Sequence, residues 1–381
     1  MLEEEPGRRI VRIGIDAHYL GNQKTGNETY TLNLMRSLAR VDTSRNDYCI
    51  YLTNPAVAAH QVVADPRFQN RLLEPATAIL RLPIVFPREL ARRPVDLLHA
   101  QYFVPPFVSC KTVVTIHDIS FAYRSTDFRS LHRWGLKCLV PWSIRRAERV
   151  LVVSQWLKDA VVRLYGVEPE KVVVTHLGVS EHFYPHDIES ARTYLATNFG
   201  IEESFILYVG NIVPGKNISG ILRAFGKLRQ CRETQATKLV IIGPKLWGWS
   251  AASALADELN LQDRITWLGY VHQEHLPRFY SACQAFLFPS FSETFGLPVL
   301  EAMSCGAPVV ASNRGALPEV TAGAAVLINP DSPDDIAEGL FHVLCDPQFA
   351  ADLRRKGIER GRTFSWETTA LKTLEVYNQL M

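Results

Sequence analysis

The sequence lacks the features of several large protein classes. Its seven cysteines are scattered and never spaced Cys-x2-Cys, so neither a disulfide framework nor a thiolate zinc site is indicated. No stretch of the 381 residues approaches the roughly 18 consecutive apolar residues of a membrane-spanning helix. The chain starts with an acidic segment rather than a basic leader before an apolar run. We therefore expect an unprocessed cytoplasmic protein.

A large excess of charge of one sign is also absent. The net charge of +2 gives no reason to expect a nucleic-acid partner. The distribution is uneven, because residues 1–183 hold 24 basic against 18 acidic residues while the remainder is acidic overall. The N-terminal half is therefore the more cationic.

Short β-rich runs alternate with helical patterns along the whole chain. Many of these runs are continuously apolar, as expected of strands covered on both faces. The runs are 10–16, 48–53, 95–100, 111–117, 149–154, 205–210, 238–243, 264–269, 285–290 and 307–312. This rhythm is typical of doubly wound parallel sheets.

The rhythm pauses in a polar, turn-rich stretch at residues 176–187, with about five predicted strands on each side. We therefore predict an α/β chain of two Rossmann-like doubly wound domains that face each other across a cleft. The predicted N-terminal domain spans 1–181 and the C-terminal domain 182–365, with an amphipathic helix at 366–381 crossing back onto the first domain.

A strand, a loop and a helix follow one another in "FILYVGNIVPGKNISGILRAF". Free N–H groups at a helix start, together with the ammonium of Lys216, form a site suited to a phosphate. Gly210-x4-Gly215-Lys216 satisfies most of a P-loop, but Asn217 stands where a P-loop needs Ser or Thr to hold magnesium. A solvated lysine at a helix start is the simpler alternative.

Two glutamates flank a tight turn in "SETFGLPVLEAM". Glu293 lies on the loop after a predicted strand, and Glu301 lies in the following short helix. Each has a plain structural explanation, as a solvated loop acid or as compensation of a helix dipole. Together they could hold a ribose diol and a sugar, with the amides of the turn between them meeting phosphates.

These motifs resemble retaining glycosyltransferases of family 4, which have the GT-B fold. The Glu-x7-Glu stretch, "GNIVPGKN", "TIHDISF" and "TGNETYTLNLMRSLAR" all contribute to a similarity that spans residues 11 to about 362. The resemblance implies transfer of a hexose from a nucleoside diphosphate sugar to a hydroxyl of a glycan or lipid-linked acceptor. It inclines toward bacterial polysaccharide enzymes that use GDP-mannose, with no cofactor beyond the sugar nucleotide as co-substrate.

The resemblance also assigns roles to particular residues. It implies that Lys216, Glu293 and His117 serve catalysis, with His117 beside the transferred sugar and Glu293 positioning that sugar rather than attacking it. The residues expected to bind the donor are Gly26, Asn211, Gly215, Phe295, Gly296, Leu297 and Glu301. We interpret His18 and His99 as structural histidines.

The chain departs from the family pattern at several positions. A second basic residue is common beside the loop lysine, where this chain has Asn211 and Gly215, and a glycine is common where Thr294 stands. The N-terminal loop carries Gly26-Asn27 in place of two glycines. Arg278 and Arg314 are the candidates for the missing cation. No Asp-x-Asp pair occurs, so we expect metal-independent catalysis.

The sequence fits other functions less well than sugar transfer. An oxidoreductase would need Gly-x-Gly-x-x-Gly after the first strand, which "GIDAHYLGNQKTG" lacks. A nucleotide-sugar epimerase and a non-enzymatic sugar-nucleotide-binding scaffold remain as alternatives.

Two segments of the cationic half alternate arginines with large apolar residues, at 79–94 and 128–149. Such stretches can lie on an anionic membrane surface, although amphipathic helices are first a sign of core packing. We expect peripheral contact of the N-terminal domain with the inner face of the membrane and a lipid-linked or polysaccharide-precursor acceptor.

Overall fold

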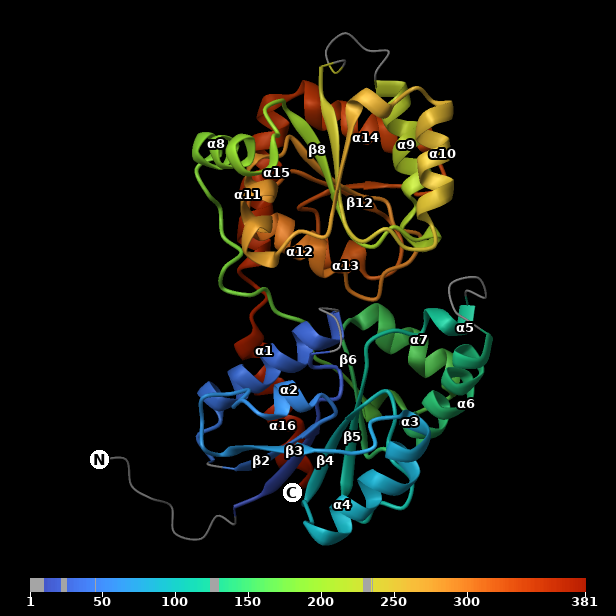
Figure 1. Ribbon diagram of the computed structural model, residues 1–381, viewed down its shortest axis with the longest axis vertical. Coiled ribbons are helices and arrows are strands. Elements are labelled where there is room, and N and C mark those ends of the chain that lie inside the picture. Colours follow the sequence, from blue (N-terminus) through green and yellow to red (C-terminus); the bar gives the residue numbers. More distant parts are fainter. Residues whose placement is uncertain (1–9, 22–25, 45, 124–129, 229–233, 235) are drawn as a thin grey trace, which may run out of the picture. The chain divides into compact units, whose positions relative to one another are not determined.

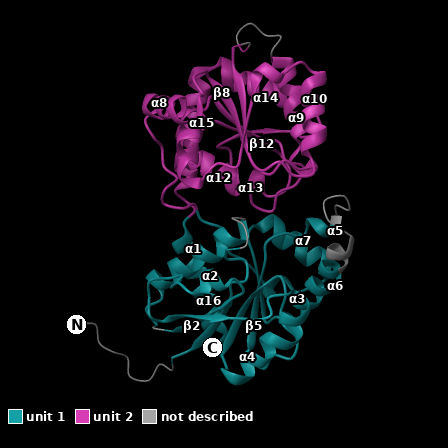
Figure 2. Cartoon of the chain, viewed as in Figure 1, with its two compact units in different colours: residues 1–178, 365–381 teal, residues 179–364 magenta. Residues whose placement is uncertain are grey.

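The computed structural model describes residues 10–21, 26–44, 46–123, 130–228, 234 and 236–381 (Figure 1). The chain divides into two compact units (Figure 2). Unit 1 comprises residues 1–178 and 365–381, and unit 2 comprises residues 179–364. The first observed boundary lies three residues before the predicted one at 181, and the second lies one residue before that at 365.

Unit 1 is built on a seven-stranded parallel sheet with the order β3-β2-β1-β4-β5-β6-β7. Its strands are β1 (Arg12–Asp16), β2 (Asp47–Leu52), β3 (Phe68–Leu72), β4 (Leu97–Gln101), β5 (Lys111–Ile116), β6 (Arg149–Val152) and β7 (Val172–Val174). Its helices are α1 (Gly26–Val41), α2 (Pro55–Ala58), α3 (Ala78–Leu80), η1 (Arg81–Val85), α4 (Phe86–Arg92), α5 (Ser120–Tyr123), α6 (Ser130–Arg146), α7 (Gln155–Tyr165), η2 (Pro169–Lys171) and α16 (Trp366–Leu380).

Unit 2 carries a six-stranded parallel sheet with the order β10-β9-β8-β11-β12-β13. Its strands are β8 (Phe205–Val209), β9 (Lys238–Ile242), β10 (Ile265–Gly269), β11 (Ala285–Phe288), β12 (Val309–Ser312) and β13 (Val326–Ile328). Its helices are α8 (Ile188–Phe199), η3 (Pro214–Lys216), α9 (Ile218–Leu228), α10 (Trp249–Glu258), η4 (Gln262–Arg264), η5 (Gln273–His275), α11 (Leu276–Ala282), α12 (Leu297–Ser304), α13 (Leu317–Thr321), α14 (Pro333–Cys345) and α15 (Pro347–Gly361).

The prediction of two Rossmann-like domains is confirmed, and all ten predicted strands are present. Their continuous apolar runs are buried because helices cover both faces of each sheet, as β4 and β11 show over their whole length. The sequence missed β3, β7 and β13, which are all edge strands. Edge strands pair on one side only, and these three are partly exposed; β3 carries mostly polar residues, while β7 and β13 are apolar but only three residues long.

Helix α16 belongs to unit 1 and packs on α1. Ser365 caps its first turn by accepting the N–H of Thr368 at 3.0 Å, and Tyr377 meets His99 inside the unit at 2.5 Å. The chain enters the helix past Gly178, where an added Cβ would come within 2.1 Å of the Trp366 nitrogen. The last helix is therefore an integral part of the first unit. Within the described residues no helix is long and apolar enough to cross a bilayer.

We predict that Gly178→Ala destabilises unit 1 by about 1–3 kcal/mol, because the methyl group would force the start of α16 away from its seat. Thermal and urea unfolding of the full chain measure the effect. Gly135→Ala is the matched control, since a Cβ at this position in α6 meets nothing within 4 Å. It should leave stability unchanged or raise it slightly. Equal effects of the two substitutions would contradict the close approach at Gly178.

Candidate functional site

The candidate residues follow strands at or beside the switch point of each sheet, where successive strands are added in opposite directions. In unit 2 the chain returns to the centre of the sheet so that β8 lies between β9 and β11, and in unit 1 β1 lies between β2 and β4. Loops diverge at such switch points, and ligands of open α/β sheets bind there, beyond the carboxyl ends of the strands. Lys216 follows β8, Glu293 follows β11, and His117 directly follows β5, which neighbours β4.

The loop after β8 is held by Asn217, the residue that excluded a P-loop. Asn217 is buried in the left-handed conformation at φ 60°, and its side-chain oxygen accepts the N–H of Gly220 at 3.1 Å. Its amide nitrogen donates to Pro289 and Pro330 carbonyls at 3.2 and 2.7 Å. Asn217 therefore caps the start of α9 and fastens it to the loop after β11.

Lys216 and Glu293 form an ion pair across the switch point of unit 2. Lys216 Nζ donates a hydrogen bond to Glu293 Oε1, and Nζ also lies 5.4 Å from the centre of the Phe288 ring. Their side chains are 27% and 12% exposed, so the pair is partly shielded from solvent but open to a ligand. The structure thus brings together two residues that the sequence placed in one site without predicting their contact.

The turn after Glu293 is fixed by close backbone contacts. Gly315 lies at φ 66°, and a Cβ there would come within 2.2 Å of the Glu293 carbonyl oxygen, which accepts the N–H of Ala316 at 2.9 Å. Gly296 precedes α12 at φ 96°, where a Cβ would meet Leu317 at 2.5 Å. Both positions require glycine, because only it tolerates this conformation and this proximity.

Of the turn residues expected to bind the donor, Gly296 and Leu297 present the N-terminus of α12, and no side chain caps that helix. The described part of the chain supplies no hydrogen-bond acceptor for their two N–H groups. Phe295 differs, because its ring is buried 5.8 Å from that of Phe364. Its side chain belongs to the core, which leaves only its backbone for a ligand.

Glu301 lies in α12 with its carboxyl group against Tyr280, whose hydroxyl donates to Oε2 at 3.2 Å. Burial raises the pKa of Glu301 to about 8, and the Tyr280 hydrogen bond opposes this shift only in part. The carboxyl is therefore largely protonated at neutral pH in this state. A protonated Glu301 can donate one hydrogen bond as well as accept others.

His117 is buried in unit 1 and takes part in a chain of hydrogen bonds. Gln101 donates from its amide nitrogen to the Asp16 carbonyl at 2.9 Å and to Thr31 Oγ1 at 2.6 Å. This leaves the Gln101 oxygen to accept from His117 Nε2 at 3.2 Å. Burial, helped by nearby His99, lowers the pKa of His117 to about 3. His117 is therefore a neutral imidazole with Nε2 protonated and Nδ1 able to accept.

His18 and His99, which we interpreted from the sequence as structural histidines, both have partners within unit 1. His99 bonds Tyr377 at 2.5 Å and Thr115 at 2.6 Å through its two ring nitrogens. His18 Nδ1 lies 2.9 Å from Asp16 Oδ1, and although burial would raise the pKa of Asp16, this contact and nearby Arg81 lower it. Sequence reasoning missed Gln101 and Asp16; the signal available was a polar residue at the carboxyl end of a buried strand.

The remaining candidates are placed as follows. Gly26 is the first residue of α1, Asn211 is exposed after β8, and Gly215 lies in η3, where its carbonyl accepts the N–H of Phe291 at 3.1 Å. Both arginines proposed as a second cation for the phosphates already have other partners. Arg278 stacks on Tyr194 at 4.3 Å, and Arg314 forms an ion pair with Asp331.

Comparisons with known proteins agree with this geometry. Residues 25–183 match the model of Glycosyltransferase Family 4, and residues 196–363 match that of Glycosyl transferases group 1. The O-antigen chain mannosyltransferase B of Escherichia coli is 32% identical over 285 residues, which cover 74% of each chain. A D-inositol 3-phosphate glycosyltransferase of Mycobacteroides abscessus is 31% identical, covering 98% of this chain and 89% of that protein.

Among solved structures, a sucrose-phosphate synthase of Thermosynechococcus elongatus superposes with a TM-score of 0.79 at 24% identity, covering 97% of this chain and 99% of that one. Two parallel-sheet domains with this likeness define the GT-B fold, and the two family models define the class as glycosyltransferase. The chain belongs to glycosyltransferase family 4, as its motifs predicted.

The raised pKa of Glu301 predicts a specific dependence of stability on pH. Because its folded pKa of about 8 lies above the ordinary value of 4.5 for a glutamate carboxyl, its contribution to stability is complete below about pH 4.5 and is lost as the pH rises through 8. The loss amounts to at most about 1.4 kcal/mol per pH unit in that window. Glu301→Gln should remove this dependence on pH. The stability of the variant relative to wild type should therefore be greater at pH 9 than at pH 5.

Urea unfolding at pH 5, 7 and 9 provides the measurement. Glu202→Gln serves as the control, since Glu202 is an exposed glutamate of the same unit. Parallel pH profiles for wild type and Glu301→Gln would show that Glu301 is not held in its protonated form.

Proposed function

We propose that the protein transfers a hexose, with retention at the anomeric carbon, from a nucleoside diphosphate sugar to a hydroxyl of a glycan or lipid-linked acceptor. The observation that carries this proposal is the Lys216–Glu293 pair at the switch point of unit 2, beside the uncapped start of α12. A cation and free amides suit a diphosphate, and a carboxylate next to them suits sugar hydroxyls.

In this proposal the chemical task is to support an oxocarbenium-like sugar while a diphosphate leaves with growing negative charge. Lys216 and the amides of Gly296 and Leu297 meet that charge. Glu293 already orients the ammonium of Lys216, and it positions the donor sugar through its remaining lone pairs. The leaving phosphate takes the proton of the acceptor hydroxyl in a front-face attack.

The other residues act on either side of this centre. Glu301 holds the ribose diol, for which its position in the helix after the turn and its capacity to donate or accept are suitable. His117 offers Nδ1 as a neutral acceptor to the transferred sugar, and its lowered pKa keeps it uncharged at neutral pH. Unit 1 binds the acceptor, and no metal ion is required.

Mannose is the hexose that we favour, with GDP as the nucleotide. The support is the likeness to the O-antigen chain mannosyltransferase B, over three quarters of the chain, together with the "TIHDISF" and "GKN" motifs. Calorimetry with GDP-, UDP- and ADP-sugars tests the donor directly. Tighter binding of a UDP- or ADP-sugar than of GDP-mannose would overturn this choice, and product released from the donor without an acceptor would point to an epimerase.

Lys216→Ala is expected to lower turnover about 100- to 1000-fold, the effect of removing one preorganised partner of the transition state. Part of that loss would come from the unpaired Glu293 carboxylate, which repels a diphosphate. The double variant Lys216→Ala with Glu293→Gln should therefore bind nucleoside diphosphate more tightly than Lys216→Ala alone.

Lys238→Ala is the matched control, because Lys238 begins β9 and therefore lies at the amino ends of the strands, away from the loops that follow their carboxyl ends. EDTA should leave the wild-type rate nearly unchanged. A strict requirement for added Mg²⁺, or a turnover of Lys216→Ala close to that of wild type, would contradict the assignment.

The two glutamates should separate in kinetics. Glu301→Ala should weaken binding of free nucleoside diphosphate, because a ribose contact stabilises ground state and transition state alike. Glu293→Ala should leave diphosphate binding intact and lower kcat. Calorimetry and steady-state kinetics on both variants decide the matter, and loss of thermal stability alone in both would return the carboxylates to a structural role.

A further inference from the structure

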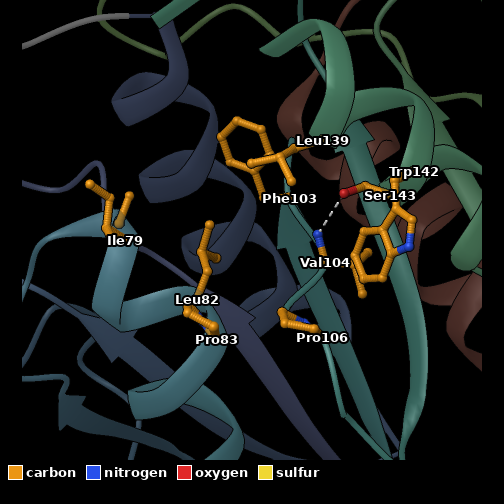
Figure 3. Close-up of a pocket in the computed structure, with 10 residues that line it drawn as sticks. Ile79, Leu82, Pro83, Phe103, Val104, Pro106, Leu139, Trp142 and Ser143 are labelled. Carbon is orange, nitrogen blue, oxygen red and sulfur yellow. Dashed lines mark hydrogen bonds between the residues drawn. The ribbon is translucent and has the colours of Figure 1, made fainter. Parts of the chain in front are cut away.

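Unit 1 contains an apolar hollow built by the two segments that the sequence singled out for their alternation of arginines and large apolar residues. Its volume of about 370 Å³ is within the range of small-molecule pockets. Figure 3 shows one wall formed by Ile79, Leu82 and Pro83 and the opposite wall by Leu139, Trp142 and Ser143, with residues 103–106 between them. The first wall comes from α3 and η1, and the second from α6.

The lining offers a ligand almost no polar partner. Ser143 contributes the one side-chain hydroxyl of the lining, and it accepts the N–H of Val104 at 3.0 Å, so its acceptor role is already used (Figure 3). A pocket of this kind selects hydrocarbon over sugar or phosphate, because a polar group placed there would lose its hydrogen bonds to water. The hollow therefore differs in chemistry from the charged pair of Lys216 and Glu293 in unit 2.

The rim of the hollow exposes large apolar side chains to solvent. Ile79 is 84% exposed and Phe107, next to the lining residue Pro106, is 89% exposed. Other members of this rim, which we define as the exposed apolar residues of the lining and its neighbours, are Leu80, Ile84, Leu139 and Trp142. An apolar patch of this extent around a pocket marks an interaction surface.

Basic residues accompany the rim. Arg145 follows Trp142 by three residues on α6, and Arg88 follows Ile84 by four, so each pair lies on neighbouring positions of a helical surface. Arg92 continues the Arg88 row. All three are exposed, and no acidic partner for them occurs in the described ranges, whereas Arg93 is paired with Glu89 at 3.6 Å. Within the described residues, the apolar rim is thus bordered by arginines that have no acidic partner.

We propose that this surface seats unit 1 on a bilayer that contains anionic phospholipid, with one acyl chain entering the hollow and the arginines meeting phosphate headgroups. The chemistry of both parts supports this occupant. Aliphatic chains fit the apolar lining, Trp142 and Phe107 suit the level of the headgroups, and exposed cations are attracted to an anionic surface. The proposal does not depend on which sugar the enzyme transfers.

The test is flotation of the purified full chain with vesicles of phosphatidylcholine, with and without phosphatidylglycerol, at low and high salt. We expect co-flotation with the anionic vesicles at low salt and its loss at high salt or with phosphatidylcholine alone. Arg88→Glu and Arg145→Glu should each lower the vesicle partition coefficient at least about fivefold. Arg163→Glu, on the exposed surface of α7, is the control for charge.

Ala78→Trp separates the hollow from general surface hydrophobicity. Ala78 lines the hollow from α3, so an indole there would fill it while adding apolar area to the surface. We expect weaker vesicle binding than in wild type. Leu139→Trp, on the opposite wall, repeats the test if the first variant fails to fold, and Leu371→Asp, an exposed apolar residue of α16, is the control for losing apolar surface.

Three outcomes would overturn the proposal. Absence of co-flotation of wild type at low salt would exclude the bilayer. Equal or stronger binding of both tryptophan variants would exclude the hollow. Binding of dodecyl phosphate to wild type but not to Ala78→Trp, without vesicle flotation, would identify a free lipid-linked molecule as the occupant instead of the bilayer. Sugar transfer to a soluble acceptor, measured alongside, should be the same in all of these variants.

Discussion

The ion pair between Lys216 and Glu293 links the loops that follow β8 and β11, the two paired strands at the switch point of the unit 2 sheet, and the proposed donor site is built around it. Each residue lies on a loop whose backbone is independently fastened, Lys216 through Asn217 and Glu293 through the approach of Gly315. The charged groups of Lys216 and Glu293 are held against each other, and their side chains are only 27% and 12% exposed to solvent. A pair held in this way costs little to reorganise when a dianionic ligand arrives, since the ammonium is already oriented.

In contrast to the ion pair of unit 2, the corresponding polar side chains of unit 1 are uncharged. Its buried strand ends carry His117, Gln101 and His99, all uncharged and linked to neighbours by hydrogen bonds, and burial lowers the pKa of both histidines to about 3 and 4. Asp16, at the end of β1, is compensated by His18 and Arg81. At His117 unit 1 thus offers neutral hydrogen-bonding groups of the kind that suit sugar hydroxyls, whereas the loops after the central strands of unit 2 carry the charged pair of Lys216 and Glu293.

Much of this could be predicted from the sequence, because strong local signals coincide with central elements. Continuous apolar runs identified the ten predicted strands, and the stretch "SETFGLPVLEAM" was predicted to hold a loop followed by a short helix, which is α12. The sequence could not supply contacts made across the fold. The pairing of Lys216 with Glu293, the burial of Glu301 against Tyr280 and the stacking of Arg278 on Tyr194 each join segments at least 20 residues apart. Asn217 is a residue that the sequence analysis noticed for another reason, as one that breaks the P-loop pattern. The structure shows that its side chain fastens the loop after β8.

In the proposed donor site, the protonation of Glu301 would couple nucleotide binding to the electrostatics of that site. A buried carboxyl that is neutral adds no negative charge near a diphosphate, so the site presents Lys216, one compensated carboxylate and free amides to an incoming dianion. If Glu301 ionised before binding, its charge would oppose the ligand at close range in a region of low dielectric. A ribose hydroxyl that donates to the carboxyl would favour the ionised form and lower its pKa again. In the proposed site Glu301 is therefore the carboxyl group whose charge a bound ribose would change.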